Sequence, residues 1–189
     1  SSFTDRRTFA LKSLAVASLA ALGFSAAQAQ GTVKVGVLHS LSGTMAISET
    51  VLKDTVLMAI DEINAKGGLL GKKLEVVSRD DGANPGDAVR VAEELITREG
   101  VNIIAGTFLS HIGLAVTEFA GKKQVFFLAA EPLTDKITWS NGNRYTFRLR
   151  ASTYMQVAML MPDAVKAKKK RWALVYPNFE YGQSAAAAF

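Results

Sequence analysis

Four residues of the types that hydrolases use in catalysis lie at or just past the ends of two predicted strands. His39 and Ser42 belong to the first strand and its following turn, and Asp80 and Asp81 to the second. A nucleophile, a base and an acid could converge there, and the paired carboxylates could hold a metal ion. However, the G-x-S-x-G turn that exposes a nucleophilic serine is absent, and the chain has only two histidines and no cysteine. We therefore expect no catalytic residue, no metal site and no enzymatic activity.

A nucleotide site would need a glycine-rich phosphate loop, and neither common pattern is complete. The turn after the first strand lacks G-x-G-x-x-G. Gly71-Lys72 resembles the end of a P-loop, but Lys66 stands where the first glycine should be and Lys73 where Ser or Thr should be. We interpret the glycines at 67–71 as a turn and expect no cofactor.

The positive charge of the chain is confined to two segments. The formal net charge of the 189 residues is +5, and the excess basic residues lie in 1–29 and in Lys166–Arg171, whereas 30–150 is balanced. A nucleic-acid partner would require a basic face on the fold itself, so we expect none. A hydrophobic content of 49% suits a globular protein with a buried core.

Residues 1–29 resemble an export signal. Arg6-Arg7 supplies the positive start, 13–24 is an apolar stretch too short to span a bilayer, and Ala-Gln-Ala at 27–29 fits signal peptidase cleavage after Ala29. The two arginines also resemble the twin-arginine motif, so the Sec and twin-arginine routes both stay open. The alternative is a buried helix of the mature fold. We expect a periplasmic protein.

The rest of the chain alternates apolar strands with amphipathic helices. Strands separated by helices require βαβ crossovers and a buried parallel sheet with helices on both faces, which is an α/β fold. Asn84 is expected to cap one helix, and Gly121 to end another. The predicted strands are 33–39, 73–80, 101–105 and 125–128, and the predicted helices are 52–63, 85–96 and 113–120.

The pattern lapses after residue 130 and then restarts. A loop over 131–143 is followed by a strand at Arg144–Arg150, a helix at 152–168, a strand at Trp172–Tyr176 and a helix opening near Tyr181. The chain ends inside that last helix, so we expect a larger protein. The predicted organisation is a signal peptide at 1–29, a first lobe at 30–148 and the beginning of a second lobe at 149–189.

A ligand of an open parallel sheet binds beyond the carboxyl ends of its strands. Free backbone N–H groups and helix N-termini favour an anionic group at this edge. Ser110 could donate its hydroxyl to a carboxylate there, or it could be a plain N-cap residue. The segments that reach this edge are 40–48, 81–85, 107–111 and 129–133.

Several motifs in order resemble the type I periplasmic solute-binding proteins of ABC importers. KVGVLHSLSGTMAISE and DEINAKGGLLGKKLE are most similar to the urea and short-chain amide binders. FFLAAEPLTD, YTFRLR and RWALVYPNFEYGQSAAAAF are closer to the branched-chain amino-acid binders. The resemblance covers 31–189 and implies two lobes that close on a solute, with Arg144–Arg150 as the first crossover. It also implies a chain about twice as long and a membrane permease as partner.

The resemblance assigns ligand-binding positions one by one. Ser110 matches the serine that holds the ligand carboxylate, Tyr181 matches the tyrosine of the second lobe that packs on the ligand, and Ala129 and Ala130 match positions whose backbone receives the polar groups of the ligand. The remaining positions that the resemblance implies line the same pocket and are Ser42, Ser48, Phe108 and Leu109.

Glu131 departs from the family pattern, because a hydroxyl residue is usual there. A carboxylate would repel the ligand carboxylate or accept from an ammonium or amide N–H. Either the ligand is not a plain aliphatic amino acid, or Glu131 points away from it. An amide, urea-like or cationic ligand is therefore a rival to an amino acid.

The function expected from these residues is capture of a small polar solute, most simply a branched-chain or other amino acid, by a monomeric subunit that delivers it to an ABC permease. An amide or urea binder, or a cytoplasmic amide sensor on the same fold, is the alternative. A secreted hydrolase and a receptor ligand-binding domain are further alternatives. Because one lobe cannot enclose a ligand, we expect residues 1–189 alone to bind weakly or not at all.

Overall fold

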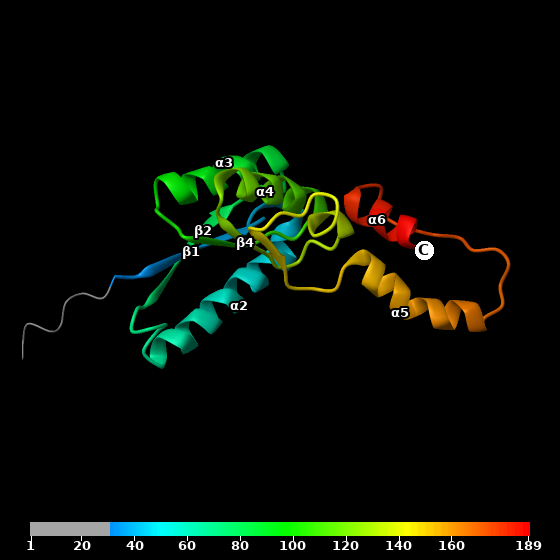
Figure 1. Cartoon of the computed structure of the whole chain (residues 1–189), viewed down its shortest axis with the longest axis horizontal. Coiled ribbons are helices and arrows are strands. Elements are labelled where there is room, and N and C mark those ends of the chain that lie inside the picture. The colour runs from blue at the N-terminus through cyan, green and yellow to red at the C-terminus, as the bar shows by residue number, and fades with distance from the viewer. Residues whose placement is uncertain (1–30) are drawn as a thin grey trace, which may run out of the picture. The chain divides into compact units, whose positions relative to one another are not determined.

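Five parallel strands form one sheet in the computed structural model, which describes residues 31–189 (Figure 1). The leader predicted over 1–29 lies outside the described residues. The strand order is β2-β1-β3-β4-β5, and the neighbouring strands are parallel, as predicted for an α/β fold. The strands are β1 (Val33–His39), β2 (Leu74–Asp80), β3 (Ile103–Gly106), β4 (Phe126–Ala129) and β5 (Thr146–Arg148).

The chain adds its strands on both sides of β1, with β2 on one side and β3, β4 and β5 on the other. This strand pairs with β2 on one side and with β3 on the other, so that Leu38 lies opposite both Arg79 and Gly106. Connections on the two sides of such a switch point leave toward opposite faces and open a crevice beyond the carboxyl ends. The loops that follow β1, β3 and β4 therefore border the edge at which the sequence predicts a ligand.

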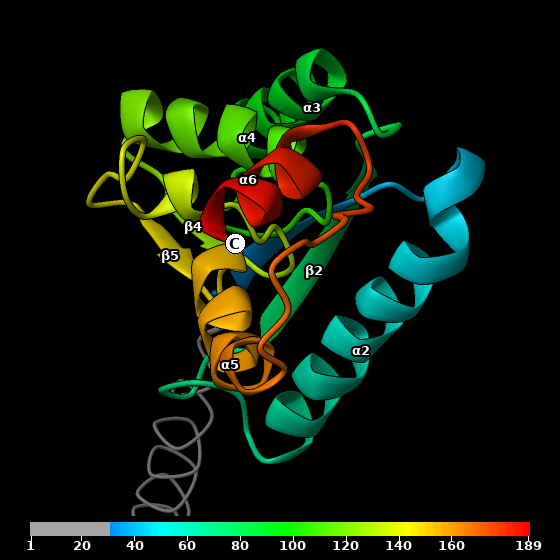
Figure 2. The ribbon, with the colours of Figure 1, turned by 90° about the vertical axis from the view of Figure 1, so that its right-hand side faces the viewer.

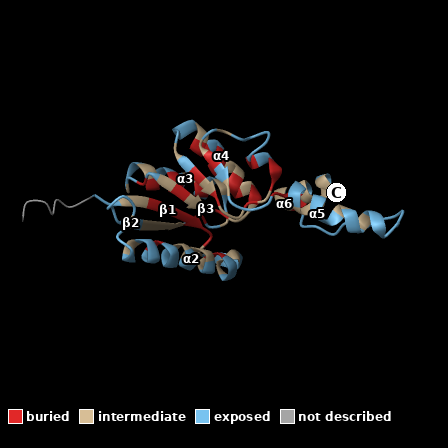
Figure 3. Ribbon diagram, turned by 60° about the horizontal axis from the view of Figure 1, so that its bottom comes forward, coloured by how far each residue is buried: buried red, intermediate tan, exposed pale blue. Residues whose placement is uncertain are grey.

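Helices cover both faces of the sheet, but unequally (Figures 2 and 3). α2 lies on one face, and α3 and α4 lie on the other. The α3–α4 side holds the main core, which includes Leu38, Leu95 and Phe127, whereas the smaller hydrophobic cluster on the α2 side has Val35, Val37 and Ile60 as its buried residues. No helix within residues 31–189 is long and apolar enough to cross a membrane. The helices are α2 (Ala46–Ala65), α3 (Pro85–Thr97), α4 (Ser110–Lys123), α5 (Thr153–Lys166) and α6 (Glu180–Ala188).

The sequence predicts the start of α3 correctly but not the end of α4. The predicted cap of α3 is confirmed, because Asn84 Oδ1 accepts hydrogen bonds from the N–H groups of Gly86 (2.8 Å) and Asp87 (3.1 Å). The prediction that Gly121 ends the next helix is wrong. α4 continues past it and stops at Gln124, whose backbone is left-handed with φ 58°. A glycine is tolerated inside a helix when a close neighbour occupies the space of its missing side chain.

The chain after β5 forms two helices joined by an irregular segment. Ser152 caps α5 by accepting a hydrogen bond from a backbone N–H, and α6 begins at Glu180, next to the predicted start at Tyr181. The strand predicted at Trp172–Tyr176 is wrong, because this segment pairs with no strand among the described residues and Val175 is fully exposed. A strand forms only where a neighbour satisfies its backbone groups.

Candidate functional site

A cavity of about 320 Å³ lies at the carboxyl edge of the sheet. Its walls come from the turn after β1, the loops after β3, β4 and β5, and the segment that leads into α6. Its volume is at the lower end of the range for small-molecule sites, about 300–1,000 Å³. The residues that line it are Met45, Phe108, Leu109, Ser110, Glu131, Leu133, Arg150, Pro177, Phe179 and Tyr181.

A second, larger hollow of about 550 Å³ lies along α2 and is a weaker candidate. All of its lining residues belong to this one helix, so the hollow has no opposing wall. A ligand there would stay exposed to water and would gain little from burial. The cavity at the sheet edge is therefore the candidate functional site. The residues along the hollow are Asp54, Leu57, Met58, Asp61, Glu62 and Ala65.

Ser110 is the first residue of α4 and is almost completely buried. The interpretation of Ser110 as a plain N-cap is wrong, because Leu109 holds that position. Ser110 Oγ accepts hydrogen bonds from the N–H groups of Leu133 and Thr134, each at 3.2 Å. A hydroxyl has two lone pairs and one proton, so these contacts leave the O–H as its remaining hydrogen-bonding group. Ser110 can therefore act toward a ligand only as a donor, which suits a carboxylate or a carbonyl.

Glu131 lines the cavity, and its orientation toward a bound ligand stays a prediction. Its carboxylate forms an ion pair with the guanidinium of Arg150, which lines the same cavity. The backbone N–H of Glu131 donates to the carbonyl of Thr107 at 3.3 Å, so β3 helps to fix this loop. The repulsion that the sequence predicts between Glu131 and a ligand carboxylate is thus countered by an adjacent cation.

Five of the nine residues that the resemblance implies lie around the cavity, and the other four do not. Ser42 is exposed, and its side chain forms a hydrogen bond with Asp80. Burial acts to raise the pKa of the Asp80 carboxyl, but hydrogen bonds from Ser42, Gly82 and Leu41 outweigh burial and lower that pKa. Ser48 was expected in a loop but lies on the exposed side of α2, which begins at Ala46. The five that line the cavity are Phe108, Leu109, Ser110, Glu131 and Tyr181.

Ala129 and Ala130 do not line the cavity, but their backbone groups bond to the segments beside it. The carbonyl of Ala129 accepts from the N–H of Leu149 at 3.1 Å, and the N–H of Ala130 donates to the carbonyl of Gly106 at 3.0 Å. These backbone groups hold the sheet and the crossover together. A direct contact of either alanine with the ligand stays a prediction.

Five lining residues were not assigned from the sequence. Arg150 is the most informative of them, because a cation at the end of the predicted crossover strand could have been matched with the unusual acid Glu131. Phe179 directly precedes α6, and an aromatic residue before a helix could stack on a ligand but is more often part of a core. The apolar residues offered no signal, since a Met, Leu or Pro in a loop is not specific to any chemistry. The five are Met45, Leu133, Arg150, Pro177 and Phe179.

The hydrolase candidates do not assemble into a triad. His39 is buried and its Nδ1 lies 2.9 Å from Glu49 Oε2, whereas Ser42 bonds to Asp80. Asp81 is buried, accepts from Ser40 Oγ at 2.5 Å, and lies apart from the cavity lining. Burial raises the pKa of Asp81 although the hydrogen bonds from Ser40 and Ala83 oppose the shift.

These contacts fix the turn after β1, and they pair His39 with Glu49 and the exposed Ser42 with Asp80, so the candidate nucleophile and base are not paired with each other. Within residues 31–189, no group of three or more His, Cys, Asp or Glu side chains is placed to hold a metal ion.

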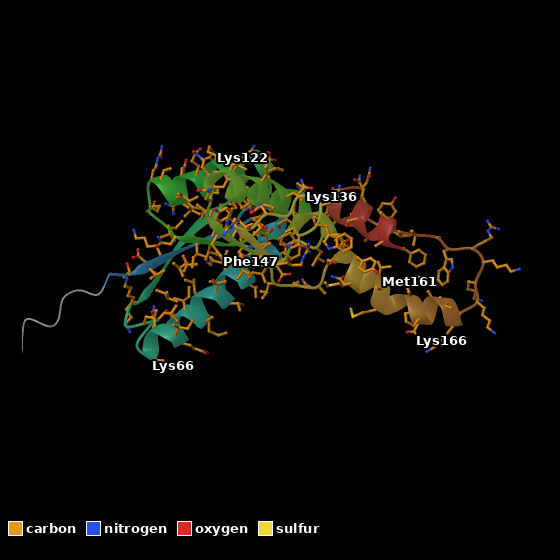
Figure 4. All side chains as sticks on the ribbon, viewed as in Figure 1. Lys66, Lys122, Lys136, Phe147, Met161 and Lys166 are labelled. Atoms are coloured by element: carbon orange, nitrogen blue, oxygen red, sulfur yellow. The ribbon has the colours of Figure 1, made fainter. Side chains whose placement is uncertain are left out.

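Polar contacts join the cavity loops to α5 and α6. Asp135 Oδ2 accepts from Thr153 Oγ1 at 2.7 Å, and Ser184 of α6 lies within hydrogen-bond distance of the same threonine. Glu180 accepts from Thr134 Oγ1 at 2.7 Å and pairs with Lys136 at 3.0 Å, and Figure 4 shows Lys136 beside α6. α6 is thereby held with its first turn, which carries Tyr181, against the cavity.

The chain matches the Periplasmic binding protein family over residues 32–189. It is 33% identical over 184 residues to Leu/Ile/Val-binding protein homolog 7 of Brucella suis biovar 1 (strain 1330), an alignment that covers 93% of this chain and 46% of that protein. The chain thus spans about half the length of the curated relatives it matches.

Two solved structures share its fold. The branched-chain amino acid transporter substrate binding protein LivJ from Streptococcus pneumoniae, in complex with isoleucine, is 29% identical with a TM-score of 0.61, over 65% of this chain and 35% of that one. A solute binding protein of an ABC transporter from Rhodopseudomonas palustris BisB5, in complex with 3,4-dihydroxy benzoic acid, is 27% identical with a TM-score of 0.75, over 83% of this chain and 42% of that one. The family match extends over all but the first of the described residues, and the chain therefore belongs to the Periplasmic binding protein family.

Proposed function

We propose that this chain is the ligand-capturing part of a periplasmic subunit of an ABC importer, and that it binds a branched-chain or other α-amino acid. Ser110 carries the proposal: it is a buried hydroxyl, with only its proton left to offer, at the first turn of α4 and in a cavity of small-molecule size. The N-terminus of a helix favours an anionic group such as a carboxylate.

The remaining walls suit the apolar part of such a ligand. Phe108, Leu133 and Tyr181 are among a lining that is mostly apolar, with polar groups at few points, which is the usual composition of a small-molecule site. The relatives support an amino acid because a protein named for leucine, isoleucine and valine and a structure holding isoleucine are among them. Export by the leader, delivery to a membrane permease and a monomeric state belong to the same proposal.

A short-chain amide or urea is the second candidate. Glu131 favours it, because this carboxylate lines the cavity and can accept N–H groups. A cytoplasmic amide sensor would use the same contacts.

The test is a thermal-shift and calorimetry panel on the full-length protein with leucine, isoleucine, valine, acetamide, urea and 3,4-dihydroxybenzoate. A ligand present at a hundred times its Kd adds about 2.7 kcal/mol to the free energy of unfolding, which such a screen detects. We expect one of the amino acids to bind, and Ser110→Ala to weaken binding at least about tenfold, as for one lost hydrogen bond to a charged group.

Ser140→Ala is the matched control for that variant, because Ser140 is exposed and its Oγ donates a hydrogen bond to the side chain of its neighbour Asn141. If acetamide or urea binds and no amino acid does, the second candidate replaces the first. If Ser110→Ala binds an amino acid as tightly as Ser140→Ala, the carboxylate is held elsewhere and the proposed role of Ser110 is wrong.

A further inference from the structure

Glu131 and Arg150 are the two charged side chains that line the cavity, and they carry opposite charges. The two groups contact each other as an ion pair. The cavity wall therefore has no net charge but has a negative and a positive pole side by side. Apart from this pair and Ser110, the lining side chains are apolar or aromatic.

Neither charged group is saturated by the other. A carboxylate can accept about four hydrogen bonds and a guanidinium can donate five, whereas one contact joins Arg150 Nη1 to Glu131 Oε2. The Glu131 side chain is 15% exposed and that of Arg150 is 49% exposed. Glu131 is thus held in the wall, while the half-exposed guanidinium of Arg150 has room to turn toward a ligand.

The two poles come from different segments of the chain. Glu131 follows β4, and its backbone N–H bonds to Thr107 after β3. Arg150 follows β5, which leads directly into α5, and its neighbour Leu149 bonds to Ala129 at the end of β4. The separation of the poles is therefore set by the sheet edge, which also positions Ser110. A ligand seated at Ser110 shares the cavity with both charges.

A paired acid and base beside a small apolar cavity discriminate ligands by charge. A simple carboxylate would gain from Arg150 but would be repelled by Glu131, and a simple amine would meet the reverse. A zwitterion offers an ammonium to the acid and a carboxylate to the base, so each pole keeps a partner. Charges that face like charges cost binding free energy, and this cost is the means by which a site rejects the wrong partner.

We propose that the Glu131–Arg150 pair is the specificity determinant of this cavity and selects zwitterionic amino acids over the carboxylic acids and amines that share their side chains. The inference rests on the proposed function, because it requires the ligand to occupy this cavity. It adds that the charges of the ligand decide which ligands bind, and it names Glu131 and Arg150 as the two residues that set this selectivity.

The experiment measures by calorimetry, on the full-length protein, the Kd of leucine, 4-methylpentanoate and 3-methylbutylamine. The last two lack the ammonium and the carboxylate of leucine respectively. Wild type is expected to prefer leucine over both. In Glu131→Gln the acid no longer repels an anion, so the preference for leucine over 4-methylpentanoate should fall at least about tenfold.

Arg150→Gln supplies an independent readout that does not depend on the folding of the first variant. There the preference for leucine over 3-methylbutylamine should fall by a similar factor, about tenfold, because Glu131 is left without its counter-ion. Glu118→Gln is the matched control, since Glu118 pairs with Lys122 on the exposed side of α4. It should leave both preferences unchanged.

The outcomes separate this inference from the proposed function. If wild type binds leucine but Glu131→Gln and Arg150→Gln keep its preferences, the role of the pair is wrong and the proposed function stands. Isoleucine, valine and phenylalanine, each with its deaminated acid, are titrated in the same way. If wild type binds none of the four amino acids, both the inference and the proposed function fail.

Discussion

The hydroxyl of Ser110 fixes the loop after β4 and keeps one hydrogen-bond donor free for the cavity. Its hydroxyl accepts two backbone hydrogen bonds from the loop after β4, so α4 and that loop are locked together at one atom. The same two bonds fix the direction of the O–H. A donor that is already oriented before the ligand arrives loses little rotational freedom on binding, and such preorganisation favours affinity. The residue that we propose to bind the ligand is thus also the residue that positions this loop.

Asp135 has a comparable role at the junction with α5 and α6, and its contribution depends on pH. Burial acts to raise its pKa, but hydrogen bonds from Ser152, Thr153 and the N–H of Tyr154, together with the charge of Arg148, outweigh burial and lower the pKa below the ordinary 3.8. A carboxyl whose pKa is lower in the folded protein stabilises the fold above its unfolded pKa, and this stability is lost as the pH falls through the folded pKa.

We therefore expect Asp135→Asn to lower the free energy of unfolding by about 1–2 kcal/mol at pH 7, because the N–H of Tyr154 loses a charged acceptor. The difference from wild type should shrink as the pH falls below 3.8. Urea unfolding between pH 7 and pH 3 measures it. Asp163→Asn is the control, since Asp163 is exposed on α5 and should change stability little. A pH-independent difference would contradict the assignment.

The site residues that could be predicted from the sequence are those with a chemical signature. Ser110 and Glu131 stood out, one as a hydroxyl at a helix start and the other as an acid where a hydroxyl is usual. Arg150 was missed because a cation in an alternating strand suggests solvent exposure, and nothing in the sequence says that its neighbour across the sheet edge is Glu131. Ser48 was misplaced because the turn after β1 is shorter than expected and α2 takes up that position.

The packing of α4 against the loop after β4 depends on one glycine. A Cβ built on Gly113 would lie 2.6 Å from two ring carbons of Pro132 and 3.2 Å from Ile137. Pro132 is flanked by Glu131 and Leu133, both of which line the cavity. The close approach of helix and loop thus sets the position of one cavity wall. This explains why a residue with poor helix propensity lies in the first turn of a helix that carries the site.

Gly113→Ala should accordingly destabilise the fold by about 1–3 kcal/mol, as overpacking does, although alanine is the better helix former. Gly121→Ala is the comparison, because its Cβ would meet the Asn143 side-chain amide at 3.0 Å, and a side chain can move where a proline ring in a fixed loop cannot. We expect the smaller loss there. Equal losses in urea unfolding would show that the Pro132 contact does not limit the approach of α4.

The strands of the sheet were predictable because buried parallel strands are continuous apolar runs, and each predicted strand before residue 130 overlaps an observed one. Trp172–Tyr176 has the same composition, yet it forms no strand because hydrophobic character does not supply a pairing partner. Gly121 shows the opposite error. Its sequence signal for a helix end is real, but the Asn143 side chain lies against it and bonds to the Thr117 carbonyl at 2.9 Å, so the helix continues.

The two faces of the sheet differ in how many residues their helices bury, and few residues of the segment after β5 are buried. α4 and α5 have the same length of fourteen residues, but α4 buries seven of them and α5 buries only Thr153. Met159, Leu160 and Val165 of α5 are at least 65% exposed. Local opening free energies follow burial and range from near zero to the global value. Within the 189-residue chain, α5 should therefore open independently of the sheet.

Hydrogen–deuterium exchange on the 189-residue chain compares the two helices within one sample. We expect the amides of α4 to exchange at least about tenfold more slowly than those of α5. Opening α4 requires disruption of the main core, whereas α5 is held mainly by its cap at Ser152 and by hydrogen bonds of its first turn to Leu133, Asp135 and Ser184. Comparable protection of the two helices would contradict this. In the full-length protein, addition of the ligand identified by calorimetry should slow exchange around residues 177–183, since this segment lines the cavity from the side of α6, and leave α2 unchanged.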